Sequence, residues 1–174
     1  YKLIDNEIAN AKAGKEAYMI LKMNSLADEQ LIAKLYQAGK AGVSIKLIIR
    51  GMCCLVPGVK DVSENISAIS IVDKYLEHAR VQIYCNGGKE LIYLTSADFM
   101  TRNIDNRVEV GFPIYNEQLR AEIRNIINIQ LMDNTKAREI NANNSNKYHR
   151  TTAETLSRAQ IDIYNYLKNK KTKN

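Results

Sequence analysis

The sequence has little of several residue types, and each shortage excludes a kind of protein. Among its 174 residues there is no Trp, and there are only two Phe, two Pro and two His. The longest apolar runs, such as residues 45–49, are far shorter than the roughly 20 residues that cross a bilayer. The start of the chain also lacks the apolar stretch of a secretory signal. We therefore expect no transmembrane segment and a cytoplasmic location, with membrane association of a full-length form left open.

Cysteine is also scarce, and its three positions do not form a metal-binding pattern. Cys53 and Cys54 are adjacent, Cys85 is distant, and no two cysteines have CxxC spacing. A structural zinc site would need a fourth ligand, and the chain has only two histidines. We expect reduced thiols in a cytoplasmic protein, with all three cysteines buried as small apolar residues.

Positive charge is in modest excess, and most of it comes from the C-terminal end. The formal net charge is +6, and four lysines within the last seven residues account for most of it: Lys168, Lys170, Lys171 and Lys173. Such a tail says little about a polyanionic partner. We expect residues 168–174 to be disordered. We expect residues 1–174 to form a single domain of a longer protein, because the chain opens inside an amphipathic helix without an initiator Met.

Apolar periodicity predicts alternating helices and strands. The predicted helices are residues 2–13, 28–40, 116–133 and 152–167, and the predicted strands are residues 16–23, 43–50, 68–72, 81–85, 90–94 and 107–112. A helical turn is expected at 74–77, a hairpin turn at 86–88, and a long irregular connection at 51–65. The alternation indicates an α/β fold with a mixed, mostly buried β-sheet flanked by helices.

The residues most suited to chemistry begin with an H-x-R pair at the entrance of a predicted strand. Residues two apart in an extended chain point to the same face, so His78 and Arg80 are expected side by side. The imidazole exchanges a proton near neutral pH, and the guanidinium offers forked donors to phosphate oxygens. The pair therefore suits phosphoryl chemistry.

Further polar residues follow within the same strand–hairpin–strand unit: Ser96, Asp98, Arg102, Arg107 and Glu109. Each alone is more often a surface or structural residue, and an isolated Arg-x-Glu is usually a surface ion pair. Their clustering with His78 and Arg80 favours a functional site. His149, close to Lys147 and Arg150, is expected to be a solvated histidine near the tail, with a contribution to a polyanion path as the alternative.

This unit resembles the second catalytic motif of the phospholipase D superfamily, H-x-K-x4-D followed by G-S-x-N. Arg80 stands where that family usually has Lys, and Asn86-Gly87 follows where its Asp would lie. A closer resemblance is to the C-terminal domain of bacterial polyphosphate kinases. It is carried by IRGMCCLVPG at 49–58, SENI at 63–66, SIVDKYLEHARV at 70–81, NGG at 86–88, YLTSADFMTRNIDNRVEV at 93–110, and ARE and NKYHR near 137–139 and 146–150.

The resemblance implies a phospholipase-D-like domain that forms one half of an ATP and polyphosphate site. Such enzymes reversibly transfer the terminal phosphate of ATP to polyphosphate through a phosphohistidine that belongs to a preceding domain. It implies a catalytic role for His78 and a nucleotide-binding role for Arg50, and it places Arg107 and Glu109 near the phosphates and Mg²⁺. The expected ATP- or phosphate-binding residues are Arg50, His78, Arg80, Arg102 and Arg107, and Glu109 is the expected neighbour of the metal.

The expected cofactor is Mg²⁺ bound with ATP, and the expected partners are ATP or ADP, polyphosphate and the remaining domains of the same polypeptide. We expect the full-length protein to form homo-oligomers and to bind no nucleic acid, and the isolated domain to be inactive. The main alternative is a phospholipase-D-like phosphodiesterase or nuclease acting as a dimer. A third possibility is a basic module that only binds polyanions.

Overall fold

The computed structural model describes residues 1–150 and 155–171. In chain order its elements are α1 (Lys2–Lys12), β1 (Tyr18–Met23), α2 (Glu29–Lys40), β2 (Ser44–Ile49), β3 (Ile66–Ser70), β4 (Val81–Tyr84), the short 3₁₀ helix η1 (Asn86–Gly88), β5 (Leu91–Thr95), α3 (Thr101–Asp105), β6 (Gly111–Pro113), α4 (Glu117–Leu131), β7 (Arg138–Glu139) and α5 (Ala159–Lys171). None of these helices is long and apolar enough to cross a membrane.

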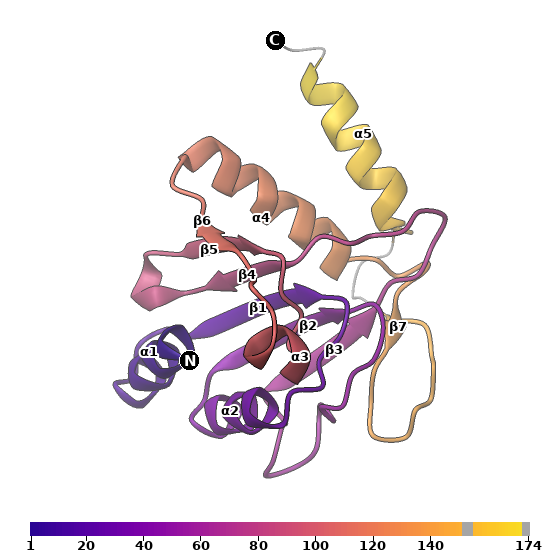
Figure 1. Cartoon of the computed structure of the whole chain (residues 1–174). Helices are drawn as coiled ribbons and strands as arrows, with labels where there is room; N and C mark the ends of the chain where they lie inside the picture. The colour runs from indigo at the N-terminus through magenta and orange to yellow at the C-terminus, as the bar shows by residue number, and fades with distance from the viewer. Residues whose placement is uncertain (151–154, 172–174) are drawn as a thin grey trace.

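One mixed sheet organises these elements, in the order β6-β5-β4-β1-β2-β3-β7 (Figure 1). The central strands β1, β2 and β3 are parallel to one another, because α2 and the long connection 51–65 return the chain to the same end of the sheet. The remaining neighbours pair antiparallel. The carboxyl ends of β1, β2, β3 and β5 and the start of β4 therefore lie at the same end of the strands, which we call the shared edge of the sheet.

The two faces of the sheet carry separate apolar cores. On one face, Met19, Leu21 and Leu47 pack with residues of α1 and α2 such as Ile4 and Leu35. On the other face, a second cluster includes residues of β1 to β5 together with α4 and the start of α5. The sheet is thus covered by helices on both sides (Figure 1), and its central strands are buried, as the near-continuous apolar sequence of β2 predicts.

Local sequence explains where helix α2 begins. The Asp28 side chain accepts a hydrogen bond from the Leu31 N–H at 2.9 Å and so caps the first turn. Between β4 and β5, Asn86, Gly87 and Gly88 all have positive φ, which glycine and asparagine adopt most readily. These residues close the predicted hairpin.

The predicted α/β class and the mixed, buried sheet flanked by helices are confirmed, but several predicted boundaries are wrong. Residues 74–77 form no helical turn. Strand β6 starts at Gly111 rather than 107, because Gly111 already pairs with Thr95, the last residue of β5, and the preceding residues have no strand beside them. Helix α3 and strand β7 were not predicted.

The C-terminal helix also differs from its prediction. It begins at Ala159 rather than 152, because the Asp133 carboxylate accepts the Ala159 N–H at 2.7 Å and caps the helix there. It then continues to Lys171, so residues 168–171 are helical rather than disordered, and Lys170 forms an ion pair with Glu122 of α4. Residues 151–154 of the predicted helix and 172–174 of the predicted tail lie outside the described residues.

All three cysteines are free thiols, but they are not all buried. Cys85 is buried, Cys53 is half-buried and Cys54 is exposed. Burial raises the pKa of Cys53 to about 11, so this thiol is protonated at neutral pH. The prediction of reduced thiols is consistent with this arrangement, whereas the prediction of a buried Cys54 is wrong.

Candidate active site

Polar residues from four separate segments meet at the shared edge of the sheet. Asn24 directly follows β1, and Arg50 directly follows β2. Arg80 directly precedes β4, and Asp98 comes three residues after β5. Since β4 runs antiparallel to β1, and β5 runs antiparallel to β4 and therefore parallel to β1, these four positions lie at the same end of the strands. Ligands of open α/β sheets bind at this kind of edge, outside the carboxyl ends of strands.

The Asp98 carboxylate is the centre of this group. Arg80 donates from Nε to Oδ1 and from Nη2 to Oδ2, both at 3.0 Å. The backbone N–H of Asn24 donates to Oδ1 at 2.7 Å, and that of Ser25 donates at 3.3 Å. The Arg80 and Asp98 side chains are only 12% and 9% exposed, so little water competes for this pair.

Asn24 extends these contacts to Arg50. Its Oδ1 accepts from Nε and from Nη2 of Arg50, at 3.1 and 3.0 Å. The two chain segments are drawn close by a hydrogen bond from the Gly51 N–H to the Asn24 carbonyl at 2.7 Å. A Cβ at position 51 would lie 2.9 Å from that carbonyl oxygen, so glycine is required there.

His78 lies at the other end of the same set of contacts. Its Nδ1 is 3.4 Å from Arg80 Nη1, and its Nε2 is 3.4 Å from Arg80 Nη2. Arg80 Nη1 also donates to the His78 carbonyl at 3.3 Å. The imidazole therefore lies alongside the guanidinium, as the H-x-R pattern predicts, and it is exposed rather than turned into the core.

The irregular connection that carries His78, residues 71–80, is held from beneath by Glu77. The buried Lys22 ammonium donates to Glu77 Oε2 at 2.7 Å, and Gln130 of α4 donates to the same oxygen at 2.8 Å. Gln160 of α5 donates to Glu77 Oε1 at 3.1 Å. A charge as buried as Lys22 needs such a partner, so Glu77 both neutralises it and fixes the backbone next to His78.

A second anchor holds the start of the same connection. Arg158 donates to both oxygens of Asp73, at 2.8 and 2.7 Å. The hydrogen bonds from Arg158 lower the pKa of Asp73 from its ordinary value, so this carboxylate is ionised at neutral pH. Residues 71–80 are thus tied to β1, α4 and α5 at several points although they contain no helix or strand.

Glu109 lies near Arg80 and already accepts two side-chain hydrogen bonds. Its carboxylate accepts from the Ser96 hydroxyl and from the Asn103 side-chain amide. These two hydrogen bonds, with smaller contributions from the charges of Arg107 and Arg80, lower the pKa of Glu109. Glu109 is therefore an ionised carboxylate with nearby cations.

The electrostatics of Asp98 reflect two opposing effects. Burial alone would raise the pKa of this carboxyl, but the hydrogen bonds from Arg80 and from the Asn24 N–H outweigh it and hold the pKa below its ordinary value. Asp98 is therefore ionised at neutral pH and fixes the guanidinium that lies along His78.

The structure brings together most of the predicted site residues. Contacts join Arg50, His78 and Arg80 through Asn24 and Asp98, and we call these five residues the Arg80–Asp98 group. The charges of Arg80 and of Arg107 both act on Glu109. Arg102 is exposed on α3 and makes none of these contacts. Asn24 and Glu77 were missed, although a polar residue directly after a buried strand is a recognisable signal for Asn24.

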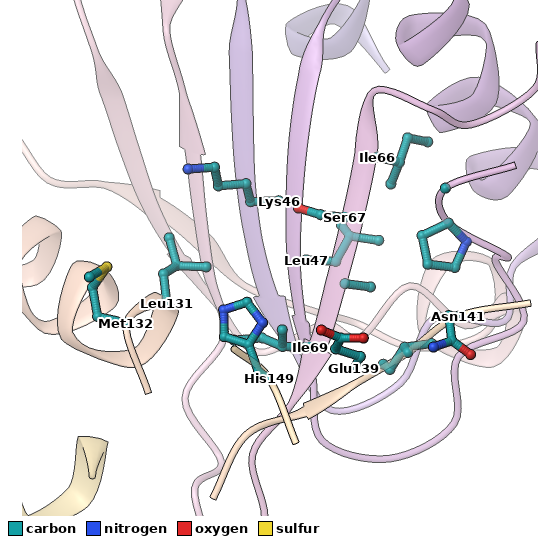
Figure 2. Close-up of a pocket in the computed structure, with 14 residues that line it drawn as sticks. Lys46, Leu47, Ile66, Ser67, Ile69, Leu131, Met132, Glu139, Asn141 and His149 are labelled. Carbon is teal, nitrogen blue, oxygen red and sulfur yellow. The ribbon is translucent and has the colours of Figure 1, made fainter. Parts of the chain in front are cut away.

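The second histidine lies elsewhere, at a cavity of about 370 Å³ on the sheet face that carries α4 (Figure 2). His149 is half-buried there rather than solvated, and its ring lies near Glu139 and Ile69. The cavity lining is mainly apolar and includes neither His78 nor Arg50. This cavity is therefore separate from the Arg80–Asp98 group.

Comparison with known proteins identifies the family. The sequence model of the polyphosphate kinase C-terminal domain 2 matches residues 1–160. The chain belongs to this family. The polyphosphate kinase of Vibrio cholerae is 54% identical to it over 169 residues, which are 97% of this chain and 24% of that protein. This polyphosphate kinase domain thus spans about a quarter of the length of that curated relative.

Solved structures agree with this assignment. The crystal structure of polyphosphate kinase from Porphyromonas gingivalis is 48% identical, has a TM-score of 0.96, and is matched over 99% of this chain and 26% of that one. Nuc, a phospholipase D family member from Salmonella typhimurium, has a TM-score of 0.55 at 15% identity, over 78% of this chain and 89% of Nuc. The likeness to Nuc shows that the domain has the phospholipase D fold.

Proposed function

We propose that this domain supplies one half of the active site of a polyphosphate kinase, which reversibly transfers the terminal phosphate of ATP to polyphosphate. The phosphohistidine of that reaction belongs to a preceding domain of the same polypeptide. The observation that carries the proposal is the continuous set of contacts from Arg50 through Asn24, Asp98 and Arg80 to His78. It holds two guanidinium groups and an imidazole at one edge of the sheet.

This arrangement suits transfer between phosphoanhydrides. Such transfers depend mainly on positioning the phosphates and neutralising charge on their oxygens. Arg50 has two of its donors on Asn24, which fixes the plane of the guanidinium and leaves Nη1 to bind the nucleotide phosphates. Donors that are oriented before the substrate arrives need no reorganisation during the reaction.

His78 and Arg80 act as a pair in this proposal. His78 is exposed and contacts the transferred phosphoryl group, giving or taking a proton at one ring nitrogen. The charge of Arg80 is largely neutralised by Asp98. The main role of Arg80 is therefore to hold His78 in place, and its second role is to provide a cation near the phosphates. Arg102 and Arg107 are exposed cations in the segment between β5 and β6. They bind phosphate oxygens more weakly than Arg50 does.

Mg²⁺ enters the proposal with ATP rather than as a resident metal. The described residues contain no group of three or more His, Cys, Asp or Glu side chains that could hold an ion by themselves. Mg²⁺ commonly takes one or two carboxylates together with substrate phosphates, and the ionised Glu109 fits the role of a single protein ligand or neighbour. Mg²⁺ bound with ATP would neutralise charge on the phosphate oxygens together with the arginines.

We also propose which partners the domain has and where it works. The domain acts with the remaining domains of its polypeptide, the complete protein forms homo-oligomers, and it works in the cytoplasm on ATP or ADP and polyphosphate. No contact with nucleic acid is part of this function.

The test has two arms. The complete protein, given ATP labelled at its terminal phosphate, is expected to form labelled polyphosphate and to return the label to ADP when polyphosphate is in excess. The 174-residue chain alone is expected to be inactive in this assay and on a chromogenic phosphodiester. Absence of transfer by the complete protein, or clear phosphodiester hydrolysis by the isolated chain, would contradict the proposal and favour a phospholipase-D-like hydrolase.

A further inference from the structure

A basic groove lies beside β7, the outermost strand on one side of the sheet, away from His78. Strand β7 pairs antiparallel with the end of β3, with Arg138 opposite Ser70. A hollow of about 330 Å³ at this pairing is lined by Ser70, Val72, Lys136, Arg138, Asn146 and Tyr148. A second hollow of about 360 Å³ shares Arg138, Asn146 and Tyr148 and adds Lys147 and Arg150. We call the two together the edge groove.

The charge of the edge groove is strongly one-sided. Lys136, Arg138, Lys147 and Arg150 line it, and Glu139 is its one acidic residue. None of these four cations forms an ion pair with any residue in the described ranges 1–150 and 155–171. The nearby Asp73 carboxylate is occupied by Arg158. The groove therefore presents positive charge that is not neutralised locally.

Arg138 is held in place before any ligand binds. It lies opposite Tyr148 in an isolated antiparallel bridge, and its guanidinium carbon is 3.5 Å from the centre of the Tyr148 ring. Its Nη1 donates to the Asn146 carbonyl at 2.9 Å. Stacking occupies the face of the guanidinium and leaves the other N–H groups on its rim for an anion. It covers one face of the Tyr148 ring, and the residue as a whole stays 41% exposed.

The groove begins close to the proposed nucleotide arginine. Ser70 lines it, and the Ser70 hydroxyl donates to the Arg50 carbonyl at 3.3 Å. Arg50 follows β2, Ser70 ends β3, and Arg138 starts β7, so the three lie on neighbouring strands at the same edge. With neighbouring strands about 5 Å apart, the Arg138 backbone is about 10 Å from that of Arg50. A chain of linked phosphates can span this separation.

We propose that the edge groove binds the distal phosphates of a polyphosphate chain while its end reacts beside His78 and Arg50. This inference rests on the proposed function. A row of four cations with one acidic residue, beginning next to the segment that carries Arg50, fits the repeating oxyanions of this substrate. The groove thus discriminates long chains from short ones, because a short chain does not reach it.

The test compares long polyphosphate with tripolyphosphate in ATP formation by the complete kinase. In the double variant Lys136→Ala/Arg138→Gln, the ratio of KM for long polyphosphate to KM for tripolyphosphate is expected to rise roughly 2- to 30-fold, the range for losing two exposed cation–anion contacts. The single variant Lys136→Ala changes a side chain with no described partner, so it keeps the test valid if loss of Arg138 impairs folding. The matched control Lys15→Ala/Lys40→Ala removes two exposed cations distant from the groove and is expected to leave the ratio unchanged.

The possible results are distinguishable. If the wild-type enzyme makes ATP from polyphosphate but neither variant changes the ratio, the edge groove is not a polyphosphate site and the proposed function stands. If the wild-type enzyme makes no ATP from polyphosphate, the proposed function itself fails. Equal competition by a single-stranded oligonucleotide of the same charge would overturn the assignment to polyphosphate, because it would show a general polyanion surface.

Discussion

Arg80 and Asp98 form a two-point ion pair, with Nε to Oδ1 and Nη2 to Oδ2 both at 3.0 Å, and His78 lies against the outer side of the same guanidinium. The residues are 18 positions apart and flank the β4–β5 hairpin. Asp98 also accepts the Asn24 N–H, so the pair joins the hairpin to the parallel half of the sheet. Placement of His78 therefore depends on a carboxylate that it does not touch.

Removing the charge of Asp98 is expected to lower the stability of the domain. Asp98→Asn leaves the Arg80 guanidinium without its counter-charge in a largely buried position, and we expect a loss of about 2–4 kcal/mol in the free energy of unfolding at pH 7. Denaturant unfolding of the domain measures it. Asp105→Asn, which changes an exposed carboxylate on α3, is the control and should cost less than about 0.5 kcal/mol. Equal effects of the two substitutions would contradict this account of the ion pair.

The stabilisation from Asp98 should depend on pH in a defined direction. The pKa of Asp98 is below its ordinary value of 3.8 in the folded state, so the unfolded chain binds the proton more readily. The contribution of the Asp98 charge to stability is fully present at pH values about one unit or more above 3.8. It is lost as pH falls through the folded-state pKa. The stability difference between the wild type and Asp98→Asn should shrink as unfolding is measured at progressively lower pH. A difference that grows on acidification would contradict it.

Asn24 and Arg50 should behave as one unit in nucleotide binding. Asn24→Ala removes the acceptor of two charged hydrogen bonds, and Arg50→Lys keeps the charge but loses the forked geometry. Each is expected to raise KM for ATP in the complete kinase roughly 10- to 100-fold, the size of a lost hydrogen bond to a charged group. The double variant should be little worse than either single one, because both remove the same interaction. Fully multiplied effects would mean that the two residues act independently.

Glu77 should be needed to position His78 although it faces away from the site. Glu77→Gln leaves the buried Lys22 ammonium unpaired, and we expect a loss of about 3 kcal/mol in stability together with lower activity. Lys22→Met in the same chain removes the stranded charge and should recover much of the stability. Glu64→Gln, at an exposed carboxylate, serves as control. Retention of full activity by Glu77→Gln would show that residues 71–80 hold His78 without this anchor.

Sequence patterns predicted the parts of the fold that depend on local chemistry. The apolar run of β2, the helical spacing of the apolar residues in α2 and the Asn-Gly-Gly turn after β4 each identified an element. The elements that were missed or misplaced depend on distant partners. Strand β7 has two residues and exists because it pairs with β3, and α5 begins where Asp133, 26 positions earlier, caps it.

The same distinction applies to the site. His78 and Arg80 were predicted to be adjacent, because spacing within one extended segment fixes which side chains share a face. The contacts of Asn24 with Asp98 and of Lys22 with Glu77 span 74 and 55 positions, and no local pattern encodes such pairs. The spacing of Arg107 and Glu109 indicated neither that Ser96 and Asn103 hold Glu109 nor that β6 starts after it.

The most direct test of the central claim is the rate of polyphosphate synthesis from ATP by the complete enzyme carrying His78→Ala, compared with His149→Ala. Both variants lose one imidazole from the same domain, and only His78 belongs to the Arg80–Asp98 group. We predict that kcat/KM falls roughly 100- to 10,000-fold for His78→Ala, the range for loss of a proton-transfer group, and changes little for His149→Ala. Synthesis by a correctly folded His78→Ala enzyme at a rate within twofold of the wild type would contradict the account.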